Sequence, residues 1–330
     1  MRKWLVAFGV VVILVVLQLT VVNQGLLSGA YIDQGPYIHQ ILILVGINII
    51  LAVSLKLING FTGQFSIGHA GFFAVGAYTS AYLVSWIEPS LRHGLHFIPV
   101  VAQDTILLLS GLIAGAAFAG VAGLAVGIPS LRLRGDYLAI VTLGFGEIIR
   151  VFILNINAIG GSRGFTGITK LSNFFWVYLF VIVAVVTVHN IVYSSFGRAF
   201  ISIRDDEIAA EAMGVDTTRF KVTSFVISSM FAGVAGALFG HFTMYLHPNT
   251  FTFIKSFEII IMIVIGGLGS IEGAIFGAIL ITVILEAFRE FGPYRLVIFS
   301  ITLILIMIYR PQGVLGSRTI FGRSGARRAK

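Results

Sequence analysis

Long apolar runs separated by short polar connections are the main feature of the chain. A helix needs about 20 apolar residues to cross a bilayer core of about 30 Å, because lipid leaves no partner for unpaired backbone groups. By that measure we expect about ten spans, at residues 5–22, 38–57, 64–86, 105–127, 136–155, 174–193, 222–246, 255–268, 272–289 and 294–309. The eighth run is short, which is typical of a tilted or re-entrant helix. The pattern predicts an all-α, polytopic helical bundle that forms one membrane domain over residues 1–330.

The composition excludes an ordinary soluble domain. Hydrophobic residues make up 57% of the 330 residues and charged residues only 11%, with a mean hydropathy of +0.99. The net charge of +8 comes from bases that lie between apolar runs and not among aromatic platforms, which argues against nucleic-acid binding. The absence of cysteine excludes disulfides, thiolate metal sites and a cysteine nucleophile.

The basic residues also predict how the bundle is oriented. If the amino terminus is cytoplasmic, fifteen of the 22 Lys and Arg residues fall on the cytoplasmic side, six fall near the outer side, and Arg150 lies within a span. Lys and Arg accumulate in cytoplasmic loops, so we expect both termini in the cytoplasm. The run at residues 5–22 has no small-x-small cleavage site after it, so we expect it to stay as the first span.

Small residues recur at every fourth position in three of the runs. Such stripes let membrane helices approach closely, and we interpret them as packing faces with no substrate role of their own. The stripes are Gly111, Gly115, Ala119, Gly123 and Gly127, then Ser228, Ala232, Gly236 and Gly240, then Gly269, Gly273 and Gly277.

A polar stretch at residues 194–221 interrupts the apolar pattern between the sixth and seventh runs. We expect it to hold one short helix, with Asp205 as N-cap, Asp206 and Glu207 in the first turn, and Gly214 at the end. A helix of about nine residues is marginal by itself in water. It must therefore lie on the bundle or dock into a partner, and its small alanines favour a close protein contact.

Four segments resemble known permeases of ABC importers. Residues 204–214 are similar to the coupling loop of these permeases, and residues 63–72, 131–150 and 310–313 resemble the branched-chain amino acid permeases of the LivM type. The outer Gly-rich loop at 160–167 is also similar to that of the family, but Ser162 and Arg163 stand where a Pro-Asn pair is often found. The basic tail at residues 311–330 matches no motif after its first residues.

The resemblance implies a non-catalytic permease subunit in a bacterial inner membrane. It implies a heterodimer with a sister permease, two ATPase subunits on the cytoplasmic side and a periplasmic binding protein on the other. No Gly-x-x-x-x-Gly-Lys-Ser/Thr motif occurs in the chain, so ATP and Mg²⁺ are expected on the partner ATPases and no cofactor on this chain. The residues implied in the ATPase contact are Asp205, Asp206, Glu207, Ala210, Glu211 and Gly214.

Polar residues inside the apolar runs are candidates for the pathway or its gate. Glu147 and Arg150 are three residues apart and share a helix face, where they either neutralise each other and lock helices together or form a gate. The remaining candidates are Asn48, Gln64, Ser66, His69 and Thr142. His93 and His96 have no further ligand nearby, so we expect no metal site.

Two other functions remain open from the sequence. An ion-coupled secondary transporter would use Glu147, Glu258 or Glu286 as the ion carrier, and a channel or structural protein would need no ATP. Within the ABC class, urea or amides are alternatives to branched-chain or other neutral amino acids. The acidic helix near Glu211 has no role in the non-ABC alternatives, so it favours the ABC interpretation.

Overall fold

The computed structural model describes residues 35–94, 99–130, 133 and 135–292, together with single helical positions between 294 and 308. The first predicted span and the basic tail lie outside these residues, and so does most of the tenth span. The described part is helical, with one isolated antiparallel bridge between Phe165 and Leu246. The predicted all-α fold is confirmed for this part of the chain.

Helices follow one another through short connections. They are α2 (Gly35–Lys56) with a π-helical turn (Leu57–Phe61), α3 (His69–Gly94), α4 (Val100–Ser130), α5 (Asp136–Asn155), α6 (Phe174–Val192), α7 (Ser195–Asp205), α8 (Glu207–Ala212), α9 (Thr217–Thr243), α10 (Phe253–Gly266) and α11 (Ile271–Ala287). Short 3₁₀ turns cover Asn157–Ile159, Gly161–Arg163, Pro248–Phe251 and Arg289–Phe291. Within the described residues, six helices are long and apolar enough to cross a membrane: α2 with its π-helical turn, α3, α4, α5, α6 and α9.

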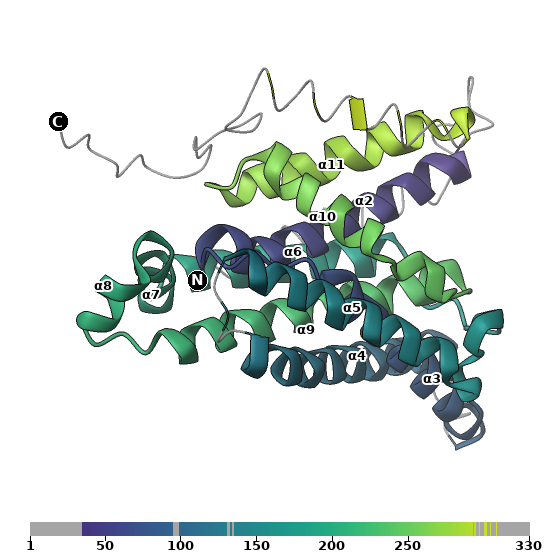
Figure 1. The fold of residues 1–330 in the computed structure, drawn as a ribbon. Helices are drawn as coiled ribbons and strands as arrows, with labels where there is room; N and C mark the ends of the chain where they lie inside the picture. Colours follow the sequence, from purple (N-terminus) through teal and green to yellow (C-terminus); the bar gives the residue numbers. More distant parts are fainter. Residues whose placement is uncertain are drawn as a thin grey trace, which may run out of the picture.

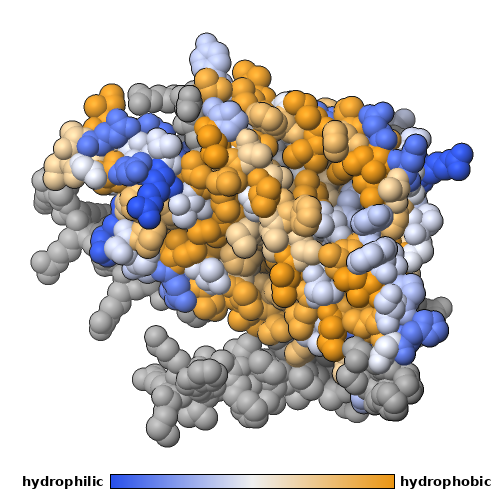
Figure 2. Space-filling view, turned by 90° about the horizontal axis from the view of Figure 1, so that it is seen from below, coloured by the Kyte–Doolittle hydropathy of each residue, from blue (hydrophilic) through white to orange (hydrophobic). Residues whose placement is uncertain are grey.

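Apolar side chains cover the middle of the molecule, and hydrophilic side chains gather at its two ends (Figure 2). Residues such as Ile113 and Phe152 are large, apolar and exposed. A surface of this kind would be unfavourable in water, and a bilayer core offers it a matching apolar solvent. One polar end carries α7 and α8, and the other carries the end of α3 and the beginning of α4 (Figure 1).

Helices α3, α4 and α9 form the tightest part of the bundle. A Cβ atom at Gly76 would collide with the backbone of Gly233, and one at Gly236 would collide with the carbonyl of Phe73. The small-residue stripes of α4 and α9 are therefore packing faces, as predicted. Gly269 is the exception, because it lies exposed in the turn between α10 and α11.

Helices α10 and α11 form a hairpin packed on α2, as Figure 1 shows on one side of the bundle. The prediction of a short eighth helix is confirmed, since the 14 residues of α10 rise only about 21 Å, less than a bilayer core. The backbones of Gly266 and Gly273 are in close contact near the turn of the hairpin, and a Cβ on either would collide with the other.

The start of the third span was predicted wrongly. The structure begins α3 at His69, and residues 63–68 are non-helical. Gly63 has a positive φ of 71°, which ends the preceding helical turn, and it lies against the side chain of Arg204. Lys56, at the end of the second predicted span, is fully buried at the end of α2, where its Nζ donates to the carbonyl of Gly267.

Candidate functional site

The polar stretch at 194–221 contains two helices, where the sequence analysis expected one. We call residues 195–212, which comprise α7 and α8, the α7–α8 protrusion. The N-cap of α8 is Asp206, and not Asp205 as predicted, because the Asp206 carboxylate accepts from the amides of Ile208 and Ala209 at 2.9 and 3.0 Å. Asp206 has extended backbone angles that break the chain into two helices, so α8 has six residues and not about nine. The side chain of Asp205 instead pairs with its neighbour Arg204 at 2.9 Å.

Two glutamates tie α8 to the beginning of α9. Glu207 accepts from Lys221 Nζ at 2.5 Å, and Glu211 accepts from Thr217 Oγ1 at 2.7 Å. The side chain of Lys221 is only 7% exposed, so this ion pair is screened little by water. Ala210 is 4% exposed and packs inside the chain, so it does not lie on the surface that the sequence analysis assigned to it. Helix α8 therefore leans on α9 and is positioned to move with it.

The outward face of α8 is apolar at its two ends. Ile208 is 68% exposed and Met213 is 84% exposed, while the backbone of Gly214 has a φ of +83° and ends the helix. Neither apolar side chain is among the residues that the sequence predicted for this contact. Their signal in the sequence is a pair of large apolar residues flanking a short, otherwise small and acidic helix.

Glu147 and Arg150 form the ion pair that their spacing predicted. Arg150 Nε donates to Glu147 Oε2 at 2.6 Å, and the other Glu147 oxygen accepts from the amide of Phe253 at 3.0 Å. Arg150 also reaches Asn249 Oδ1 at 3.5 Å. The pair thus fastens α5 to the segment that leads into α10, which favours the interpretation as a helix lock.

Four of the predicted pathway residues lie near the non-helical segment 63–68. The amide of Ile67 donates to Thr142 Oγ1 at 3.0 Å, and His69 Nε2 lies 2.9 Å from Ser54 Oγ. The side chains of Gln64 and Ser66 are buried and have no hydrogen-bond partner in the part of the chain that the structure describes. Buried polar groups without partners cost free energy, so these two mark a polar interruption of the apolar bundle.

Asn48 belongs to a different polar group, on the α2 side of the bundle. Its Nδ2 donates to Thr282 Oγ1 at 2.8 Å, and its Oδ1 accepts from Lys255 Nζ at 3.3 Å. Lys255 also pairs with Glu258 at 3.0 Å. From the sequence, Asn48 and Glu258 are candidates for separate roles, and nothing singles out Lys255 or Thr282, because only the fold brings α2, α10 and α11 together.

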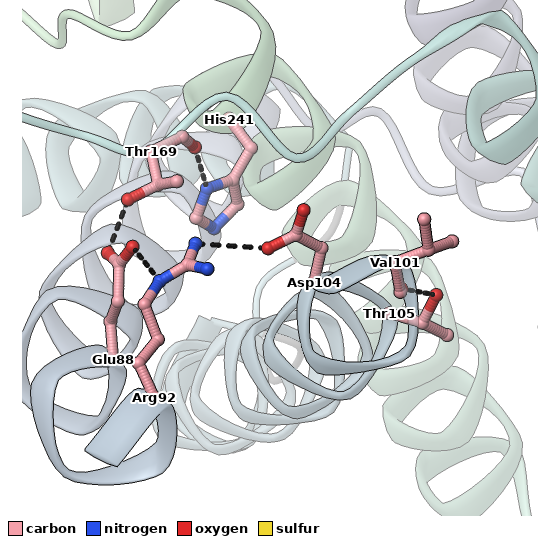
Figure 3. Close-up of polar contacts among 7 residues, drawn as sticks. All are labelled: Glu88, Arg92, Val101, Asp104, Thr105, Thr169 and His241. Atoms are coloured by element: carbon pink, nitrogen blue, oxygen red, sulfur yellow. Dashed lines mark hydrogen bonds and ion pairs between the residues drawn. The ribbon is translucent and has the colours of Figure 1, made fainter. Parts of the chain in front are cut away.

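A third polar group closes the end of the bundle opposite α8 (Figure 3). Arg92 on α3 bridges Glu88 at 2.8 Å and Asp104 on α4 at 3.0 Å. The Thr169 hydroxyl donates to Glu88, and its carbonyl lies 3.0 Å from His241 Nδ1 on α9. These contacts hold the connection between α5 and α6 against α3 and α9, and they join α3 to α4.

Helices with an apolar outer surface, polar groups kept within the bundle and polar ends define a polytopic membrane protein. Non-helical backbone and charged side chains inside such a bundle are typical of transport proteins, where they line or lock a pathway. The six long helices and the α10–α11 hairpin fit this class.

Comparison with known proteins identifies the family. The profile described as "Branched-chain amino acid transport system / permease component" matches residues 37–308. This match covers most of the chain, so the protein belongs to that family.

Curated relatives agree with this assignment. The high-affinity branched-chain amino acid transport system permease protein LivM of Salmonella typhimurium is 37% identical over 304 residues, which cover 82% of this chain and 68% of the relative. LivM of Escherichia coli K12 is 38% identical with the same coverage. The permease LivH of Salmonella typhimurium is 24% identical over 291 residues, or 81% of this chain and 90% of that protein. No solved structure matches the chain significantly.

Proposed function

We propose that this chain is the membrane-spanning permease subunit of an ATP-driven importer for branched-chain or other neutral amino acids. The family assignment supports transport of branched-chain amino acids. The similarity to both LivM and LivH supports a heterodimer of this chain with a sister permease. In this proposal a periplasmic binding protein delivers the substrate to the end opposite α8, and the complex lies in the bacterial inner membrane with about ten spans and cytoplasmic termini in this chain.

The α7–α8 protrusion is the observation that carries the ATP-driven part of the proposal. Ile208 and Met213 are large apolar side chains exposed at a polar end of the molecule. Together they offer apolar surface that a partner protein could cover. Glu211, between them in sequence, is also exposed. An apolar pair beside a carboxylate suits a groove on another protein, and we assign that groove to an ATPase subunit.

The contacts between α8 and α9 suggest how movement of an ATPase subunit could be transmitted to the transport pathway. The Glu207–Lys221 ion pair and the Glu211–Thr217 hydrogen bond connect α8 to α9. Helix α9 is in turn packed closely against α3 and α4. At its glycines Gly233 and Gly236, an added Cβ would collide with the backbone of these two helices. A displacement of α8 would therefore move these helices as a rigid body, which is the common mode of alternating access.

Nucleotide chemistry belongs to other chains in this proposal. ATP and Mg²⁺ would bind the two ATPase subunits, in keeping with the missing phosphate-binding motif of this sequence. The chain itself would have no catalytic residue.

Uptake into vesicles tests the proposal. Vesicles containing this chain, its sister permease and both ATPases, with binding protein outside and ATP inside, should accumulate labelled leucine. Isoleucine and valine should compete, and urea should not. Uptake that continues without the ATPases and collapses with a proton or sodium gradient would instead support the secondary transporter.

A further inference from the structure

A small cavity lies between α2, α10 and α11, on the side of the bundle where Figure 1 shows these helices together. Its volume is about 160 Å³. A water molecule takes about 30 Å³ in the liquid, so the cavity has room for one small solute and not for a peptide. Its lining residues, apart from five apolar ones, are Asn48, Lys255, Glu258, Thr282 and Glu286.

The polar side of the cavity carries both signs of charge. Lys255 Nζ donates to Glu258 Oε2 at 3.0 Å and to Asn48 Oδ1 at 3.3 Å. Glu286 also lines the cavity and pairs with the exposed Arg289 at 3.0 Å. The cavity therefore presents an ammonium group 3.0 Å from one carboxylate, and it has a second carboxylate in its lining.

The rest of the cavity lining is an apolar wall. Five side chains from α2, α3, α9 and α11 form this wall: Leu44, Ile47, Phe73, Phe239 and Leu285. Charges beside such a wall are costly within a membrane bundle unless they are paired. A pair of aliphatic residues would pack α10 on α2 at lower cost, so the charges suggest a ligand.

We propose that this cavity is a binding site for a neutral amino acid in its zwitterionic form. Lys255 would bind the substrate carboxylate, Glu258 or Glu286 its ammonium group, and the apolar wall its side chain. The inference rests on the proposed function, because it assigns the substrate of that function to particular residues.

The same two charged residues can stabilise the empty site and bind the substrate. While the site is empty, Lys255 and Glu258 neutralise each other. A zwitterion has no net charge and brings one group of each sign, so it replaces that ion pair with two new ones and leaves no charge unpaired. A cation or an anion alone would leave one of the two residues without a partner, which disfavours its entry.

The test uses the complete complex with the double substitution Lys255→Met and Glu258→Met. Replacing both members of an ion pair with apolar residues often preserves folding, whereas removing one member does not. We expect leucine uptake to fall by about tenfold or more, as for loss of a desolvated charge partner. ATP hydrolysis stimulated by loaded binding protein should remain, because α8 and the outer surface are unchanged. Glu290→Met, which removes an exposed carboxylate outside the cavity, is the matched control and should transport normally.

The outcomes separate this inference from the proposed function. If the unaltered complex takes up leucine and the double variant does so equally well, Lys255 and Glu258 only hold helices together and the inference is wrong. If the unaltered complex takes up no amino acid, both the proposed function and the inference are wrong. Loss of stimulated ATP hydrolysis together with uptake in the double variant would assign the pair to coupling and also overturn the binding site.

Discussion

Single residues decide how closely the helices of this permease approach. At Gly236, the backbone of α9 lies directly against the carbonyl of Phe73 on α3, and no side chain fits between them. The sequence shows the same kind of glycine in α5 at Gly144, but there a Cβ would meet nothing within 4 Å. The spacing of glycines predicts close packing in general, whereas the structure shows which of them need to be glycine.

Gly236→Ala should therefore destabilise the bundle. The added methyl forces α9 away from α3, and overpacking of this kind costs about 1–3 kcal/mol. We expect a lower midpoint of thermal unfolding for the purified protein in detergent. Gly144→Ala is the matched control and should leave the midpoint unchanged or raise it slightly, because alanine favours helix. Equal midpoints for the two variants would contradict this account of the packing.

Helix α8 is the element that links the bundle to its surroundings. It is too short to be stable alone, and it is held by its Asp206 cap and by the contacts of Glu207 and Glu211 with α9. Those inward contacts leave Ile208 and Met213 to face outward. In our proposal the inner side of the helix transmits force and its outer side binds a partner, and each side gives its own prediction.

Met213→Asp should weaken binding of the ATPase subunits. A carboxylate in an apolar groove loses its hydration without gaining a partner. Less ATPase should therefore copurify with the permease, and uptake should fall in proportion. Met244→Asp, at the opposite end of the bundle and also exposed, is the control and should copurify the ATPases normally. An unchanged ATPase yield with Met213→Asp would remove α8 from the interface.

Glu207→Gln should separate ATP hydrolysis from transport. The change leaves the nearly buried ammonium of Lys221 without its charged partner and loosens α8 from α9. We expect the amount of leucine transported per ATP hydrolysed to fall about fivefold or more, in the range of coupling free energies between sites. Glu290→Gln makes the same chemical change at an exposed carboxylate outside the α7–α8 protrusion, so its coupling ratio should stay normal. A normal ratio for Glu207→Gln would show that the ion pair transmits no motion.

At the scale of the whole molecule, the apolar surface and the two polar ends fix how the chain sits in a membrane (Figure 2). The distribution of Lys and Arg predicts that the α8 end is cytoplasmic. The fold places the connection between α5 and α6, which includes Ser162, with the polar group at the opposite end. The two ends are therefore on opposite sides of the membrane in our proposal.

Labelling of single cysteines checks this orientation, since the natural chain has none. We expect Ser162→Cys to react with a membrane-impermeant maleimide added to intact spheroplasts. We expect Met213→Cys, in cells that lack the ATPase subunits which would cover it, to react only after the membrane is permeabilised. Both positions are exposed, so a failure to react reports the membrane and not burial. The reverse pattern would invert the predicted topology and place the α7–α8 protrusion outside.

Hydropathy and residue spacing along the chain were enough to predict the class of fold and the positions of most helices. Hydrophobic length is a local property, because each stretch must satisfy its own backbone within lipid, and it located α2, α4, α5, α6, α9 and α11 within a few residues of their ends. Helix spacing likewise predicted the Glu147–Arg150 pair, whose members are neighbours on one helix. The short motifs led to the family, which the comparisons confirm.

Which distant residues meet depends on the tertiary structure. The fold ends α2 with a π-helical turn and begins α3 only at His69, because Gly63 turns the chain against Arg204. It buries Ala210 of α8 and Lys221 of α9, and it brings Asn48, Lys255 and Thr282 from three helices to one cavity. Contacts of this kind depend on which faces of the helices pack together, and hydropathy along the chain does not contain that information.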